Sequence, residues 1–411
     1  MEEDILILKS SKDSLRTKKK KIKRIIGLFL FSILIVSLGI NFTVGCRRSY
    51  FAPNKNSAKW VNAQGQKYLF IEAENEFELG KLEGKYLSAK ITNLKRIIQL
   101  FGLLNGKHGF SYLEMIKMAQ EYEKHIDLQY LEEMRGIDTA IVGVSYKDIL
   151  LQNCFIDILY GFYFSDPELN PDVSSLQMGC TVVGYKNNGS VFVGQNFDFN
   201  NVFKHSLAFV HHKIQGKHAQ FTLKVGGILS IPCGLNSAGT SVFVNVVRTN
   251  VRASYCTPIS IRCREAFDTA INPNEFKDIL TDESSSLSMN LLIANVTQMI
   301  SIEAVPGNFS ITSPDQCVNT NTYTDEFFQQ FLQDKSYSKL RQNITEDLLW
   351  NNTLDNSLSQ PEFISILNNP MIFQAESGLM GVSSLICISN EFYCKGVPSS
   401  TEVYPLIPSF F

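Results

Sequence analysis

Residues 178–200 read MGCTVVGYKNNGSVFVGQNFDFN, and this stretch predicts a β-hairpin. Runs rich in β-branched and aromatic residues lie on both sides of Asn188-Gly189. Asn-Gly at the centre of a two-residue loop is a strong hairpin signal, because both positions tolerate a positive φ. With this loop Asn187 pairs with Ser190, and that pair sets the register of both strands.

The same register brings a carboxylate to the start of the first strand. Cys180 lies opposite Phe197, and Asp198 lies opposite Gly179. We therefore expect Asn196 and Asp198 beside the Gly179-Cys180 peptide. A one-residue slip would exchange the faces of the strand but keep these neighbours. On composition alone, Cys180 remains a core residue, half of a disulfide or a nucleophile.

The residues around Cys180 suit cleavage of the peptide that precedes it. Residues 166–172, DPELNPD, contain two prolines, so the chain enters the strand from an irregular segment that we expect to be exposed. A thiol can attack the preceding carbonyl, and Gly179 has no Cβ to obstruct it. Water then opens the thioester. Cys180 becomes a new N-terminus, whose α-amine can act as base for its own thiol during substrate acylation.

Two other kinds of site have weaker support. A Cys-His mechanism needs a histidine base, and all six histidines lie between His108 and His218. Of these, His211 and His212 lie in a strand-like run, as expected of structural residues. No CxxC or Cys/His spacing is typical of zinc, so we expect neither a metal nor a cofactor.

The composition predicts a globular protein without a nucleic-acid partner. The 411 residues are 44% hydrophobic and 19% charged, enough for one large core or two modest ones. The net charge of −2 gives no basic footprint for nucleic acid. The positive charge instead concentrates in residues 16–24.

An uncharged apolar run follows this basic segment. Residues 25–45 just reach the roughly 20 apolar residues that span a bilayer core. The basic flank predicts a cytoplasmic N-terminus, hence a single-pass type II membrane protein with a lumenal or extracellular catalytic domain. A cleaved signal peptide with secretion is the main alternative, and a buried helix of a cytosolic chain is the other. The expected segments are a basic tail (1–24), a signal anchor (25–45), a linker (46–59) and one domain (60–411).

Lumenal placement is consistent with sequons and tolerates disulfides. The candidate glycosylation sites are Asn188, Asn295, Asn308, Asn343 and Asn351. The odd number of cysteines, nine, leaves at least one unpaired, and the spacing of Cys387 and Cys394 would allow them to close a small loop.

The order of elements predicts an α+β fold with antiparallel sheets. Apolar residues at helical spacing dominate 76–100 and 128–164, with a capping pattern at Ser145 and Asp148. From Cys180 onward the sequence pattern changes from helical spacing to short strand-like runs. One helix at 259–270 interrupts the strands, a helical or irregular region covers 325–367, and a last strand pair follows. We therefore expect helices first, then mostly sequential strands.

At this point several motifs together resemble a known family. Gly179-Cys180-Thr181, the Asn-Gly turn and the run GQNFDF at 194–199 are similar to the N-terminal nucleophile signature of acyl-CoA:6-aminopenicillanic acid acyltransferases. Other motifs follow in the family's order. They are GGIL at 226–229, GLNSAG at 234–239, IEAVP at 302–306 and NTN at 319–321, with EMRGI at 133–137 and the Gly80…Gly84 spacing upstream.

The resemblance implies a fold and a set of roles. The fold is a four-layer αββα sandwich of the N-terminal nucleophile (Ntn) hydrolases, cleaved between Gly179 and Cys180 into two fragments that stay associated. Cys180 would be the nucleophile, Asp198 a maturation and site-organising carboxylate, and Asn321 the oxyanion-hole donor.

Further residues line the expected pocket, and two features depart from the family. Thr181, Asn196 and Asn236 are the pocket candidates. The histidine that usually follows the oxyanion asparagine is Thr322 here, which makes Asn319 an alternative donor. The family's substrate-contacting arginine has no obvious counterpart in the motifs.

Three functions compete on this basis. The first is a self-processing cysteine amidohydrolase or acyltransferase acting on non-peptide carbon-nitrogen amide bonds of N-acylated small molecules. The second is cleavage of lipid amides or esters, as in the ceramidase and phospholipase B-like relatives of the fold. The third is a non-catalytic membrane glycoprotein, which the joint presence of Cys180, Asp198 and Asn321 disfavours.

Overall fold

The computed structural model describes most of the chain beyond residue 55. The described residues are 56–63, 66–166, 168–169, 179–187, 190–231, 233–333, 337–353, 358–372, 379–388, 391–396 and 404–406. The chain divides into two compact units, Met1–Asn54 and Lys55–Phe411, and every described residue lies in the second. The predicted anchor at 25–45 lies outside this part, within which no helix has the length and apolarity to cross a membrane.

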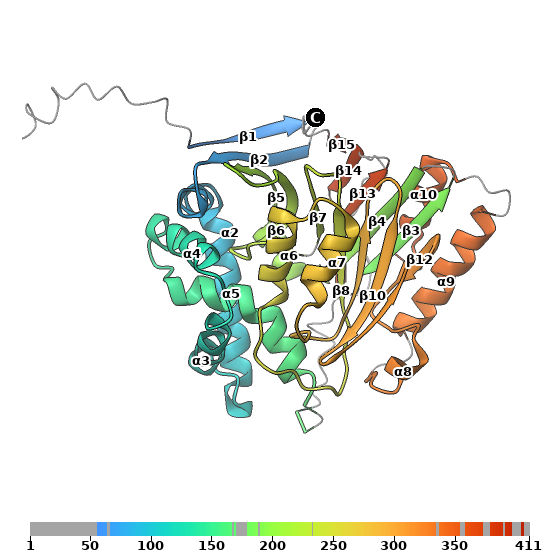
Figure 1. Cartoon of the computed structure of the whole chain (residues 1–411). Helices are drawn as coiled ribbons and strands as arrows, with labels where there is room; N and C mark the ends of the chain where they lie inside the picture. The colour runs from blue at the N-terminus through green and yellow to red at the C-terminus, as the bar shows by residue number, and fades with distance from the viewer. Residues whose placement is uncertain are drawn as a thin grey trace, which may run out of the picture. The chain divides into compact units, whose positions relative to one another are not determined.

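Two β-sheets form the centre of the second unit (Figure 1). The larger has nine strands in the order β1-β2-β5-β6-β7-β8-β9-β10-β11. All its neighbours are antiparallel except the parallel pair β2 and β5. Its strands are β1 (Ser57–Ala63), β2 (Gln66–Ala73), β5 (Leu207–Ile214), β6 (Gln220–Val225), β7 (Cys233–Asn236), β8 (Ser241–Val246), β9 (Met289–Ala294), β10 (Met299–Val305) and β11 (Asn308–Thr312).

The smaller sheet contains the predicted hairpin. Its six strands run in the order β12-β3-β4-β13-β14-β15, all antiparallel. They are β3 (Thr181–Asn187), β4 (Ser190–Asn200), β12 (Gln316–Asn319), β13 (Leu379–Ile388), β14 (Glu391–Gly396) and β15 (Tyr404–Leu406).

Helices cover the outer faces of both sheets, with α2 to α5 on one side in Figure 1 and α9 and α10 on the other. The helices are α2 (Glu76–Asn105), α3 (Tyr112–Glu123), α4 (Leu128–Ala140), α5 (Tyr146–Ile158), α6 (Ile259–Thr269), α7 (Pro273–Thr281), α8 (Glu326–Gln329), α9 (Tyr337–Asn352) and α10 (Gln360–Leu367). The predicted capping pair at α5 is confirmed, because Ser145 and Asp148 each accept a hydrogen bond from the other's backbone N–H.

The packing of β3 shows how the layers meet. A Cβ at Gly184 would lie 2.8 Å from Leu292 and Met299 of the larger sheet, so the two sheets are in close contact here. On the opposite face of β3, Val183 packs with Phe363 and Leu367 of α10. The order is therefore helix, sheet, sheet, helix, as predicted.

The register of the hairpin is also as predicted. Asn187 pairs with Ser190 and Thr181 with Asn196 along the whole β3–β4 ladder. The backbone N–H of Gly179 donates to the carbonyl of Asp198 at 2.9 Å, which continues the ladder past the start of β3. Because each pair follows from the position of the turn, a local signal was sufficient to place Asp198 beside Gly179.

The α+β class with mainly antiparallel sheets is confirmed, but several elements were not predicted. The helices α3 and α7 and the strands β11 and β12 fall where no element was expected. Before the first helix, β1 and β2 form an antiparallel hairpin. Except for α3, which has 12 residues, these are short elements whose periodicity is weak over so few residues.

Candidate functional site

Cys180 lies immediately before β3 and is completely buried. It belongs to the main hydrophobic core, with residues of the larger sheet. Burial raises the pKa of its thiol to about 12, the charge of Asp198 adds to the rise, and Arg341 opposes it. In the uncleaved chain the thiol is therefore protonated at neutral pH and out of contact with solvent.

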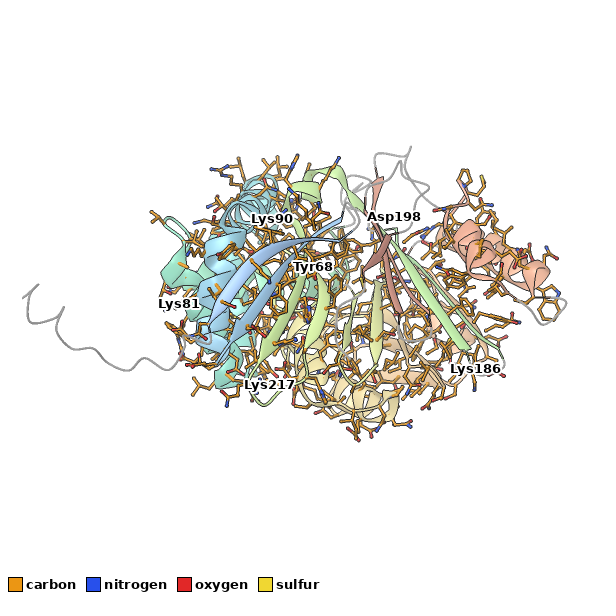
Figure 2. The ribbon with its side chains drawn as sticks, turned by 90° about the horizontal axis from the view of Figure 1, so that it is seen from above. Tyr68, Lys81, Lys90, Lys186, Asp198 and Lys217 are labelled. Atoms are coloured by element: carbon orange, nitrogen blue, oxygen red, sulfur yellow. The ribbon has the colours of Figure 1, made fainter. Side chains whose placement is uncertain are left out.

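Asp198 is the acidic neighbour of the Gly179-Cys180 peptide, because its backbone carbonyl accepts from the N–H of Gly179 and its charge acts on Cys180. Asp198 is completely buried near the end of β4, where it pairs with Gly381 of β13. Figure 2 shows it at the opposite end of the hairpin from Lys186, which precedes the turn. Its charge acts on the pKa of Cys180, so the predicted closeness of these two groups is observed.

Arg341 of α9 joins three parts of this region. One guanidinium nitrogen, Nη1, donates to the carbonyl of Cys180 at 2.7 Å and to the hydroxyl of Thr181 at 2.8 Å. The other, Nη2, donates to Oδ1 of Asn321 at 2.9 Å. The side chain is 2% exposed, so these charge-assisted hydrogen bonds form away from water.

Asn321 lies in the loop that follows β12. Its Nδ2 donates to the carbonyl of Val246 at the end of β8, at 2.8 Å, while its Oδ1 accepts from Arg341. Arg341 therefore links the two candidate groups, nucleophile and oxyanion donor. Asn319, the alternative donor, is buried and bonds to Ser301 through Nδ2 at 3.2 Å.

The remaining predicted residues divide into two groups. Thr181 lies at the site through its bond to Arg341. Asn196 is opposite Thr181 but donates to the carbonyl of Leu367 at 2.6 Å, which attaches β4 to α10. Asn236, at the end of β7, donates to the carbonyls of Phe267 and Ala270 and so holds the end of α6. These contacts give Asn196 and Asn236 anchoring roles in the uncleaved chain.

Histidine and metal chemistry find no support in the described part of the chain. The charged groups that act on the pKa of Cys180 are Asp198 and Arg341, not a histidine. His212 is completely buried, and its pKa is lowered well below its usual value by burial and by the nearby charges of Arg264 and Lys224. No group of histidine, cysteine and acidic side chains among the described residues could hold a metal.

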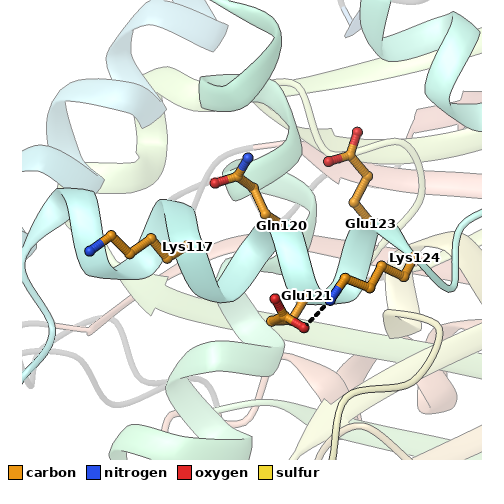
Figure 3. Close-up of a pocket in the computed structure, with 5 residues that line it drawn as sticks. All are labelled: Lys117, Gln120, Glu121, Glu123 and Lys124. Atoms are coloured by element: carbon orange, nitrogen blue, oxygen red, sulfur yellow. Dashed lines mark hydrogen bonds and ion pairs between the residues drawn. The ribbon is translucent and has the colours of Figure 1, made fainter.

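One surface hollow of the described residues lies away from the Cys180 cluster. A cavity of about 570 Å³ is lined by Lys117, Gln120, Glu121, Glu123 and Lys124, all from α3 or its C-cap (Figure 3). Figure 3 shows these side chains along one helix, with an ion pair between Lys124 and Glu121. None of them takes part in the Cys180 cluster, so this hollow carries no functional argument.

Arg341 is the residue that sequence reasoning missed. It belongs to no local motif, because the helix that carries it lies far along the chain from Cys180 and contacts it only through tertiary packing. One signal was present: Arg341 is the only arginine in residues 265–411. A single arginine in so long a stretch, within the region predicted to be helical or irregular, was a candidate for a specific polar contact.

Comparison with known proteins gives a family match. Residues 185–374 match the family model of acyl-coenzyme A:6-aminopenicillanic acid acyl-transferase, which confirms the resemblance drawn from the motifs. The matched range includes Asp198, Asn321 and Arg341 and begins just after Cys180. No curated protein matches the chain significantly.

Solved structures with partial similarity include two enzymes. A Caenorhabditis elegans N-acylethanolamine-hydrolyzing acid amidase ortholog is 15% identical with a TM-score of 0.41, over 56% of this chain and 100% of its own. A variant of the conjugated bile acid hydrolase of Clostridium perfringens is 12% identical with a TM-score of 0.42, over 55% of this chain and 92% of its own.

Proposed function

Because residues 185–374 match the family model of acyl-coenzyme A:6-aminopenicillanic acid acyl-transferase, we propose that this chain cleaves itself before Cys180 and then acts on linear amide bonds. The observation that carries the proposal is the cluster of the buried Cys180, Asp198 and Arg341 with the half-buried Asn321. Burial of the thiol means that no external substrate reaches it before the peptide at Gly179 is cut.

Cleavage would proceed by transfer of the chain from nitrogen to sulfur. The thiol of Cys180 attacks the carbonyl of Gly179, and the thiol proton passes to the departing amide nitrogen. Water then adds to the thioester, which releases a carboxylic acid at Gly179 and restores the thiol. The new α-amine has an ordinary pKa near 7.7 to 8.0, so it can accept the proton of its own thiol at neutral pH.

The mature site would then use the same thiol on a substrate amide. Sγ forms a thioester with the acyl group, the amine leaves with a proton, and water or a second amine takes the acyl group. Asn321 would donate to the oxyanion of the tetrahedral intermediate, a role worth roughly 3 to 4 kcal/mol for one such donor. Arg341 would fix the position of Asn321 relative to the Cys180 carbonyl, because it donates to both.

The substrate class that we favour is an N-acylated small molecule, cleaved at a carbon-nitrogen amide bond. Hydrolysis and acyl transfer share one acyl-enzyme, and hydrolysis is favoured because water is always present. Cleavage of a lipid amide or ester is the second candidate, supported by the apolar segment at 25–45. Release of labelled fatty acid from lipid substrates, compared with release from soluble N-acyl amino acids, separates the two.

We also propose that the catalytic unit is lumenal or extracellular, held by the 25–45 segment in single-pass type II orientation. The basic run before this segment supports the orientation. Three sequon asparagines, Asn308, Asn343 and Asn351, are exposed and so accessible to glycosylation. Six of the nine cysteines, Cys154, Cys180, Cys233, Cys256, Cys263 and Cys317, are free and buried.

N-terminal sequencing after a denaturing gel tests the self-cleavage. Purified wild-type chain should give a fragment that begins at Cys180 and ends at Phe411, whereas Cys180→Ala should stay intact. The same samples treated with an endoglycosidase should migrate faster if the unit has passed through a lumen. Cys233→Ala, which removes another buried thiol of the same core, is the matched control and should still be cut. An intact wild-type chain without amidase activity would refute the proposal.

A further inference from the structure

A polar row crosses the larger sheet on the face that meets the smaller one. Asn245 of β8 is the register partner of Asn290 of β9, and Asn290 is the register partner of Glu303 of β10. Directly paired residues of neighbouring strands point to the same face of a sheet. All three side chains are at least 95% buried, an unusual concentration of polar groups inside a core.

Each member of the row holds a successive part of the loop that carries Asn321. Nδ2 of Asn245 donates to the carbonyl of Asn319 at 2.7 Å. Nδ2 of Asn290 donates to the carbonyls of Thr320 and Thr322, at 3.0 and 2.6 Å.

Glu303 holds the end of the same loop. Its carboxylate accepts from the backbone N–H groups of Thr324 and Asp325 at 2.7 and 2.8 Å. Burial raises the pKa of Glu303, and the bonds from Thr324 and Asp325 oppose the rise. Asn245 and Asn290 therefore satisfy carbonyls of buried residues, whereas Glu303 holds the more exposed end of the loop.

The row is also connected to the hairpin of the nucleophile. Oδ1 of Asn245 accepts from Nε2 of Gln195 at 2.9 Å, and Gln195 pairs with Val182 of β3. The same Nε2 donates to the carbonyl of Val244 at 2.9 Å. Gln195 thus ties β4, which lies beside the Cys180 peptide, to the strand from which the row begins.

We infer that Asn290 is a positioning residue for the reaction, with Glu303 as its partner in the row. It fixes the carbonyls on both sides of Asn321, so that the amide of Asn321 has one direction relative to Sγ of Cys180. An oxyanion donor acts only at hydrogen-bond distance from the developing charge, and small displacements are costly. This inference rests on the proposed function, because it assigns Asn290 to the same site.

A double-mutant cycle tests the inference. Asn290→Ala should lower kcat of the cleaved enzyme on the order of tenfold or more with little change in KM, because an oxyanion donor acts mainly in the transition state. If Asn290 acts through Asn321, then Asn290→Ala in an Asn321→Ala background should cost less than about threefold. Rates are expressed per mole of cleaved chain, measured on the same gel.

Asn153→Ala is the matched control. Asn153 of α5 is a buried asparagine that also donates to two backbone carbonyls, those of Ile149 and Gly227, and none of its bonds reaches the 319–325 loop. Asn153→Ala should change kcat by the same factor in the wild-type background and in the Asn321→Ala background. Equal factors for Asn290→Ala in both backgrounds, or an effect on KM alone, would overturn the inference. If Asn290→Ala does not fold, Glu303→Gln, which removes one acceptor charge from the same row, replaces it in the cycle.

Hydrogen exchange separates this inference from the proposed function. In uncleaved Cys180→Ala chains, addition of Asn290→Ala should speed exchange of the amides in 319–325, and addition of Asn153→Ala should not. Unchanged exchange overturns the inference even when the enzyme is active. If Asn290→Ala speeds this exchange but the wild-type chain neither cleaves itself nor hydrolyses a substrate, the positioning contact is retained and the proposed function is refuted.

Discussion

Arg341 shows how one side chain can define a site that no local motif contains. Its guanidinium reaches Cys180, Thr181 and Asn321 at once, because the planar fork presents donors in two directions. The residues that it joins come from the start of β3, with the residue before it, and from the loop after β12. A lysine carries one compact ammonium group in place of two separate NH2 groups, so it cannot bind Cys180 and Asn321 at the same time in this geometry.

Arg341→Lys should therefore keep the positive charge but lose the simultaneous hydrogen bonds to Cys180 and Asn321. We expect the cleaved enzyme to retain its KM within about threefold and to lose kcat on the order of 10²-fold, comparable to removal of one oxyanion-hole donor. Arg341→Met also removes the charge that opposes the rise in the pKa of Cys180, so its self-cleavage should shift to higher pH. Rates measured across pH for both variants distinguish the two effects. An unchanged kcat in Arg341→Lys would show that the fork is unnecessary.

Among the elements, the crossing of α2 and α4 is set by glycine. A Cβ at Gly80 would lie 2.0 Å from the carbonyl oxygen of Glu133, and a Cβ at Gly136 would lie 2.1 Å from that of Phe77. Both obstacles are backbone atoms, which cannot rotate away. The Gly80 and EMRGI motifs, first noted for their resemblance to a family, thus have a packing reason.

Close approach of these helices also places a buried ionic cluster. Lys224 of β6 pairs with Glu83 of α2 at 2.5 Å, and Arg264 of α6 pairs with Glu133 of α4 at 2.7 Å. All four side chains are at most 1% exposed. A pair removed from water at this depth depends on its geometry, because separation leaves an uncompensated charge.

Gly80→Ala should consequently destabilise the protein by more than an ordinary helical substitution. The added methyl group forces α2 and α4 apart, and overpacking of this kind costs about 1 to 3 kcal/mol before any loss from the ionic cluster. Urea denaturation at neutral pH measures the change. Ser88→Ala, in the same helix but away from the glycine contact, should change the midpoint little. Equal midpoints for the two variants would contradict the role assigned to Gly80.

For the whole molecule, buried carboxyl groups and a buried histidine change the stability of the fold in opposite directions as pH falls. Burial raises the pKa of Glu133 to about 7 and that of Asp157 to about 6, above their usual values. Their contribution to stability is greatest at low pH and is lost as pH rises through those values. His212 has the opposite sign, because its pKa is lowered in the folded state. Its contribution is present above about pH 6.5 and is lost as pH falls.

His212→Gln should isolate the histidine contribution. Between pH 7 and pH 5 the wild type should lose about 2 kcal/mol relative to this variant, since the unfolded chain takes up a proton near pH 6.5 that folded His212 does not. Chemical denaturation at both pH values measures the difference. His108→Gln, an exposed position, is the control and should keep the wild-type slope. A His212→Gln variant as pH-sensitive as the wild type would refute the assignment.

The sequence by itself determined what depends on neighbouring residues. The Asn-Gly turn set the β3–β4 register, and that register placed Asp198 beside Gly179. The Ser145 cap and the change from a helical to a strand-like sequence pattern also depend on neighbouring residues, so the α+β class followed from them.

Only the tertiary structure decided which distant residues meet that hairpin. Arg341 and the row of Asn245, Asn290 and Glu303 reach the site across separate elements, and no spacing along the chain encodes such contacts. The physical reason is range: turns and caps act over a few residues, whereas the packing of two sheets brings together side chains that the chain itself keeps far apart.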